Sequence, residues 1–163
     1  GMMGEQNAVE LQDEAAWLAV CVQTNSANYG FNLATKYDRC DYLVVDDLEA
    51  RLATQNQHGP IEASVTELSA LADKVVVTRG NQGSMGWSKE SGIVSAPSTT
   101  PRVIDTLGAG DAFFAITAPM SREGSIHDLL LIGNTAGGLA AQIVGHRQHV
   151  TKAALISYLR ELP

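Results

Sequence analysis

The residues best suited to chemistry lie in one short stretch, D-T-L-G-A-G-D at positions 105–111. Glycines at 108 and 110 let a backbone approach a ligand, because no side chain stands in the way. At a helix start, successive N–H groups lack partners within the helix and attract anions such as a phosphoryl group. The carboxylate of Asp111 beside them is suited to take a proton from an attacking hydroxyl. The stretch therefore predicts phosphoryl transfer, with backbone amides stabilising the oxyanion and Asp111 as the base.

The flanking sequence provides the strand and helix that such a turn needs. Val103 and Ile104 suit the end of a strand, and the apolar run from Asp111 suits a helix, so the glycines fall between them. A simpler interpretation stays open at this point, because glycine and aspartate are also ordinary turn and capping residues at a helix start.

Short apolar strands alternate with helical segments along the chain, which predicts a mainly parallel sheet flanked by helices in three layers. Strands are predicted at 17–22, 41–45 and 75–78, helices at 27–37, 61–72, 125–145 and 151–162, and an antiparallel hairpin at 84–87 and 92–96. Ligands of such sheets gather at the carboxyl ends of the strands.

Two further polar segments follow predicted strands at that edge. One is T-x-G-x-x-G at 78–83, and a nucleotide lying across both glycine loops would suit the spacing. Alone, however, this pattern is most often a turn. The other is D-D-L-E at 46–49, where acidic residues in a first helical turn are equally well explained as partners of the helix dipole.

The 105–111 stretch resembles the C-terminal signature of the PfkB/ribokinase family of carbohydrate and nucleoside kinases. The resemblance implies that Gly108, Ala109 and Gly110 form the anion hole for the transferred phosphoryl group. It implies that Asp111 is the catalytic base for a sugar hydroxyl, with ATP and Mg²⁺ as cofactors. It further implies that Asp105 helps to hold a monovalent cation, usually K⁺.

The same resemblance assigns roles outside the signature. It implies that Thr78, Gly80 and Gly83 line the phosphate and ribose side of the nucleotide, and that Asn134 and the 145–150 loop lie near the adenine. Glu49 matches the glutamate of the family's N-x-x-E motif, which assists magnesium binding through water. Asp46 stands where the family usually has asparagine. This departure weakens the assignment of a magnesium and phosphate role to position 46 more than the assignment to Glu49.

The resemblance runs from about position 17 to position 162, which is only the C-terminal half of a typical family member. We therefore expect 1–163 to form a single domain, the C-terminal nucleotide-binding part of a ribokinase-like fold, without the N-terminal half and its lid. Because positioning supplies much of phosphoryl-transfer catalysis, we expect these residues alone to bind nucleotide weakly and turn over poorly. An uncovered sheet edge further predicts a homo-oligomer or association with the missing half.

Composition limits the partners of the chain. The net charge is −7 at pH 7, which argues against binding nucleic acid, and no apolar run reaches the ~20 residues of a membrane span. We expect a cytoplasmic protein, with Cys21 buried and Cys40 in a polar turn. A dinucleotide-binding oxidoreductase would need G-x-G-x-x-G after an early strand, which is not found. The remaining alternative is a non-catalytic nucleotide-binding or interaction module derived from a sugar kinase.

Overall fold

The computed structural model describes residues 5–24, 27–99, 107–143 and 149–162. In this part of the chain, one sheet contains five strands in the order β1-β2-β3-β4-β5. They are β1 (Ala19–Cys21), β2 (Cys40–Asp46), β3 (Ala72–Thr78), β4 (Ser84–Ser88) and β5 (Gly92–Ala96). The first three run parallel, and β4 and β5 add an antiparallel hairpin beside β3. The prediction of parallel strands extended by an antiparallel hairpin is confirmed.

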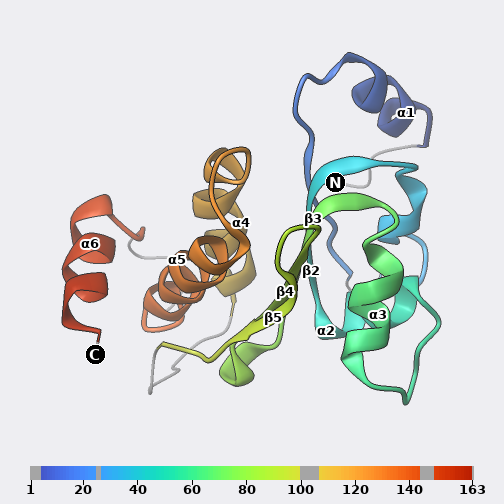
Figure 1. Ribbon diagram of the computed structural model, residues 1–163. Helices are drawn as coiled ribbons and strands as arrows, with labels where there is room; N and C mark the ends of the chain where they lie inside the picture. The colour runs from blue at the N-terminus through green and yellow to red at the C-terminus, as the bar shows by residue number, and fades with distance from the viewer. Residues whose placement is uncertain (1–4, 25–26, 100–106, 144–148, 163) are drawn as a thin grey trace.

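Helices cover both faces of the sheet (Figure 1), which confirms the three-layer α/β architecture. Figure 1 places α2 and α3 on one side, α4 and α5 on the other, and α6 beyond α5. The bounds are α1 (Glu5–Glu14), α2 (Asp47–Ala53), α3 (Ile61–Leu68), α4 (Ala109–Thr117), α5 (Ile126–Ala140) and α6 (Lys152–Glu161), with 3₁₀ turns η1 (Ala34–Lys36), η2 (Gly80–Gln82) and η3 (Ala118–Met120). None of the helices in the described residues is long and apolar enough to cross a membrane.

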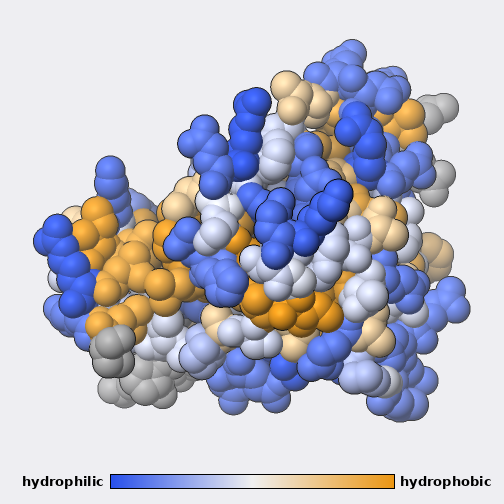
Figure 2. Space-filling view, viewed as in Figure 1, coloured by the Kyte–Doolittle hydropathy of each residue, from blue (hydrophilic) through white to orange (hydrophobic). Residues whose placement is uncertain are grey.

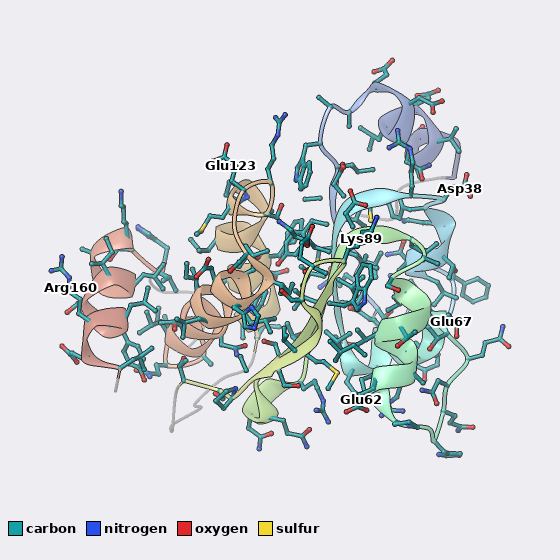
Figure 3. The ribbon with its side chains drawn as sticks, in the orientation of Figure 1. Asp38, Glu62, Glu67, Lys89, Glu123 and Arg160 are labelled. Carbon is teal, nitrogen blue, oxygen red and sulfur yellow. The ribbon has the colours of Figure 1, made fainter. Side chains whose placement is uncertain are left out.

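Alternation along β2 divides the core in two, because successive side chains of a strand point to opposite faces. Leu43 and Val45 are buried in a cluster that includes Val65 of α3. Tyr42 and Val44 are buried on the other face, in a cluster that includes Phe113 of α4. Glu67 of α3 is exposed and points away from this core (Figure 3). The space-filling view shows apolar surface over α5 and α6 (Figure 2).

The segment between β1 and β2 differs from the prediction of a helix over 27–37. It consists of turns and the short η1. Gly30 adopts φ 79°, and the side-chain amides of Asn28 and Asn32 both donate to the carbonyl of Gln23, at 2.8 and 3.2 Å. Such side chain to backbone bonds compete with helix formation, for which Asn and Gly already have low propensity. The predicted helix is therefore wrong.

Two smaller predictions are also corrected. The helix predicted over 61–72 ends at Leu68, because Ala72 already belongs to β3. The two cysteines exchange their expected environments: Cys40 is buried as the first residue of β2, whereas Cys21 is exposed at the end of β1. Among the described strands β1 lies at the edge of the sheet, so it has a neighbouring strand, β2, on one side only.

Candidate active site

The glycine turn at the start of α4 borders space that the described residues leave open. Gly108 is the N-cap residue with φ 79°, a left-handed conformation that favours glycine, and the helix begins at Ala109. A Cβ added to Gly110 would meet no atom within 4 Å, and both Gly110 and Asp111 are exposed. The first amides of a helix have no intrahelical acceptor. This helix start therefore has N–H donors without intrahelical acceptors and a carboxylate in the same turn, beside space that the described residues leave open.

A cavity of about 460 Å³ lies beside this turn. Gly108 and Asp111 line it, together with Ala112 of α4 and Ala140 at the end of α5. His149 also lines it, although the preceding residues 144–148 of the predicted adenine loop lie outside the described part. The carboxylate of Asp111 thus borders a space large enough for a small ligand.

A second groove, of about 500 Å³, lies where β2 and β3 end side by side. Asp46 and Thr78 are partners in the parallel register, so the acidic turn and the glycine loop of the prediction lie next to each other. The groove is lined by Asp46, Asp47, Leu48, Arg51, Thr78, Arg79, Gly80 and Gln82. The structure therefore brings together the two polar segments that the sequence placed at this edge of the sheet.

The two glycines of the 78–83 loop serve different needs. Gly80 has φ 55°, and a Cβ added there would meet no atom within 4 Å, so the backbone at this position is accessible. Gly83 has φ 83° and is buried, and a Cβ would lie 2.1 Å from the carbonyl oxygen of Ala96. Gly83 is thus required for packing against the end of β5, whereas Gly80 faces the groove.

Glu49 is buried and ties three segments together. Its Oε1 accepts from the amide of Thr24 at 2.7 Å, and its Oε2 accepts from the amide of Asp46 at 2.9 Å. Asp46 Oδ1 in return accepts from the amide of Glu49 at 2.7 Å, completing a capping box at the start of α2. Burial raises the pKa of Glu49, and the carboxylates of Asp46 and Asp111 raise it further, against the effect of its hydrogen bonds.

Three carboxylates from the end of β2 and the starts of α2 and α4 act electrostatically on Cys21 at the end of β1. The pKa of Cys21 is raised from 9.0 to about 12, first by removal from solvent and then by the carboxylates of Glu49, Asp111 and Asp46. Although the residue as a whole is exposed, its Sγ lies 3.7 Å from the carbonyl oxygen of Val22. Residues 90 positions apart along the chain therefore lie within electrostatic reach of each other.

Asn134 is held by the protein itself. It is buried in α5, and its Nδ2 donates to the carbonyl oxygens of Ala96 and Pro97, at 3.2 and 3.0 Å. These bonds tie α5 to the end of β5. The adenine contact of Asn134 stays a prediction, and Asp105, the predicted cation ligand, lies outside the described residues.

Magnesium fits this site only in an indirect way. No group of three or more His, Cys, Asp and Glu residues forms a metal cluster in the described part of the chain. Carboxylate oxygens are suitable ligands for Mg²⁺, which usually keeps several of its waters. Because both oxygens of Glu49 already accept backbone amides, this carboxylate fits a magnesium ion held through water.

The capping box and the Asp47 ion pairs at the groove were missed by the sequence reasoning. The pattern D-x-x-E at 46–49, before an apolar helix, is itself the signal for a capping box. The ion pairs join Asp47 to Arg51 at 2.6 Å and to Arg79 at 3.5 Å. The spacing of four to Arg51 was visible, but the contact with Arg79 depends on strand order and has no local signal.

Comparison with known proteins gives one family and several related structures. The family model described as pfkB family carbohydrate kinase matches residues 20–153. The bifunctional protein HldE of Coxiella burnetii (strain RSA 493 / Nine Mile phase I) is 30% identical over 74 residues, which are 45% of this chain and 16% of that protein. The chain thus spans only a small part of that relative.

Two solved structures share the fold over longer stretches. Arabidopsis thaliana ribokinase, complexed with ribose and ATP, has a TM-score of 0.66 and 23% identity, covering 77% of this chain and 42% of that one. Escherichia coli phosphofructokinase-2, in complex with potassium, has a TM-score of 0.77 and 20% identity, covering 96% of this chain and 51% of that one. The chain corresponds to about half the length of these two structures.

Proposed function

The chain belongs to the pfkB family of carbohydrate kinases, and from this premise we propose that it transfers a phosphoryl group from ATP to a sugar hydroxyl. The observation that carries the proposal is the start of α4, where amides without intrahelical acceptors, a Gly110 that no other described residue approaches within 4 Å, and the Asp111 carboxylate occupy one turn. Residues 1–163 would supply the C-terminal nucleotide-binding part of a ribokinase-like fold.

In the proposed reaction Asp111 takes the proton from the sugar hydroxyl as that oxygen attacks phosphorus. Its exposure beside the 460 Å³ cavity is consistent with access to a substrate. The amides of Gly108, Ala109 and Gly110 hold the phosphoryl oxygens while negative charge develops on them. Such preorganised donors are worth several kcal/mol in acyl-transfer enzymes and act in the same way on phosphoryl groups.

The nucleotide would lie across the groove at the ends of β2 and β3. Thr78 and Gly80 face its phosphates, Gly83 keeps the loop closed against β5, and Asn134 fixes α5 beside the base. Magnesium, when bound, neutralises charge on the phosphates, and Glu49 would hold it through water. Asp105 would contribute to a potassium site.

We further propose that another segment completes the sugar side of the site. The chain corresponds to 42% of the ribokinase and 51% of the phosphofructokinase-2 named above. β1 is the edge strand of the described sheet, and its free edge would pair with a strand of a missing half or of a second copy. Sizing experiments test this: self-association or capture of a co-expressed N-terminal half is expected, and a monodisperse monomer would argue against it.

The experiment for the activity itself is an ADP-release assay with Mg²⁺, ATP and a panel of sugars and sugar phosphates. It should use the full natural polypeptide, with Asp111→Asn as the matched variant. We expect sugar-dependent ADP release from the wild type only. Nucleotide binding without release for every acceptor would favour the alternative, a non-catalytic nucleotide-binding module.

A further inference from the structure

Arg79 and Arg51 share one carboxylate at the groove between the ends of β2 and β3. The Oδ1 of Asp47 accepts from Nε of Arg51 at 2.6 Å, and Oδ2 lies 3.5 Å from Nε of Arg79. All three side chains line the groove. The carboxylate therefore contacts a cation from α2 on one side and a cation from the loop after β3 on the other.

The two arginines are not equivalent. Arg51 also donates from Nη1 to the carbonyl oxygens of Asn56 and Gly59, at 3.2 and 2.9 Å. Its guanidinium therefore fastens α2 to the 54–60 loop. Arg79 has no comparable set of partners: in the described part of the chain its Nε is buried and makes no hydrogen bond, and the contact with Asp47 is a long ion pair.

Backbone hydrogen bonds fix the position of the Arg79 main chain. Its N–H donates to the carbonyl oxygen of Gly83 at 2.8 Å, and its carbonyl oxygen accepts from Gln82 at 3.0 Å. These bonds close the 79–83 turn from both sides. The guanidinium thus stands on a rigid loop beside the open backbone of Gly80.

The Nε of Arg79 is shielded from solvent and faces the carboxylate of Asp47 at 3.5 Å, whereas the side chain as a whole keeps 28% of its surface exposed. A ligand in the groove would therefore meet the Nη donors of the guanidinium. Guanidinium groups recognise phosphate by paired N–H donors, more specifically than an ammonium does. We propose that Arg79 binds a phosphate oxygen of the nucleotide triphosphate, with Asp47 balancing its charge while the groove is empty. This inference rests on the proposed function, and it assigns the specificity for a polyphosphate to a residue between the two motif positions Thr78 and Gly80.

The test compares three probes: ATP, inorganic tripolyphosphate and adenosine, by isothermal titration with the full natural polypeptide. In Arg79→Gln we expect the affinity for ATP and tripolyphosphate to fall about tenfold or more, since charge-assisted bonds are lost. The affinity for adenosine stays unchanged. Arg79→Lys recovers part of the loss, because lysine restores the charge without the paired donors.

Arg160→Gln is the matched control, since it removes an arginine charge from the exposed face of α6 (Figure 3), and it should bind all three probes as the wild type does. Thermal melting confirms that each variant is folded. Equal ATP affinity in Arg79→Gln and wild type overturns the inference and leaves the proposed kinase function standing. An equal loss for adenosine overturns it as well, because the loop as a whole would then be disturbed. A wild type that binds neither ATP nor tripolyphosphate overturns both.

Discussion

The Glu49 carboxylate accepts a 2.7 Å hydrogen bond from the backbone amide of Thr24, which lies 25 residues earlier in the chain. The same carboxylate accepts from Asp46 at 2.9 Å. One buried side chain thereby joins the loop after β1 to the junction of β2 and α2. The loops around the candidate site depend on this contact for their relative positions.

Glu49→Gln should destabilise the fold, because glutamine has one carbonyl oxygen for two backbone donors. A buried backbone donor left without its acceptor costs about 1–3 kcal/mol in the free energy of unfolding. Glu49→Ala should cost at least as much. Urea unfolding near pH 5 measures both, and a variant as stable as the wild type would contradict the described hydrogen bonds.

The difference in stability between the wild type and Glu49→Gln should depend on pH. Burial raises the pKa of Glu49 above its ordinary 4.5, so above that pH the folded state holds its proton longer than the unfolded state does. Wild-type stability therefore falls as pH rises from 4.5 through the folded-state pKa. Glu49→Gln lacks this loss, so the stability difference between this variant and the wild type should narrow as the pH rises above 4.5. A deficit that widens with pH would show that the pKa is lowered instead.

Gly110→Ala should separate stability from activity. Its Cβ would meet no atom of the described residues within 4 Å, and alanine is the better helix former, so the free energy of unfolding should be unchanged or higher by up to about 1 kcal/mol. In the proposed mechanism the methyl group fills the space of the phosphoryl oxygens, and turnover should fall at least about tenfold. A variant that keeps wild-type turnover would place the anion site elsewhere.

Gly133→Ala tests the packing that fixes α4. A Cβ on Gly133 would lie 2.3 Å from the ring of Phe113, so α4 and α5 must separate or the ring must move. Overpacking of this kind costs typically 1–3 kcal/mol. Chemical denaturation measures the loss. Gly110→Ala is the matched control, because a Cβ at that helical position would meet no atom of the described residues within 4 Å.

Cys21 reports on the charge of Asp111. Because its pKa is raised to about 12, its thiol should react with iodoacetamide at pH 8 more slowly than an ordinary cysteine, since the thiolate is the nucleophile. Asp111→Asn removes one of the carboxylates that raise this pKa, so the reaction should become faster. Asp73→Asn is the matched control, because that charge raises the pKa of Cys40 instead. Equal rates in Asp111→Asn and wild type would mean that the two residues are not close.

Much of this fold could be predicted because its signals are local. The β-branched runs of β2 and β3, the hairpin residues of β4 and β5, and the glycines before α4 each determine their own structure. The prediction of a helix over 27–37 was wrong because two asparagine side chains donate hydrogen bonds to the Gln23 carbonyl. Helix propensity alone does not predict these bonds. The pairing of Asp47 with Arg79 likewise depends on which strands become neighbours.

The candidate site was predictable to a different degree. The types and order of Gly108, Gly110 and Asp111 indicate anion binding beside a base, and the structure adds that the space in front of Gly110 is open. For Glu49 the sequence left two interpretations, and the structure adds a capping role through Asp46. That role is compatible with the proposed indirect contact to magnesium, because a carboxylate oxygen has two lone pairs.

The most direct measurement is the turnover of Asp111→Asn in the full natural polypeptide, with ATP affinity measured on the same preparation. Asparagine keeps the size of the side chain but cannot take the proton, and general-base catalysis typically contributes 10²–10⁴-fold. We therefore expect kcat to fall by about that factor while the Kd for ATP changes little. Turnover within a few-fold of the wild type would contradict the assignment of Asp111 as the base, and with it the proposed phosphoryl transfer at this turn.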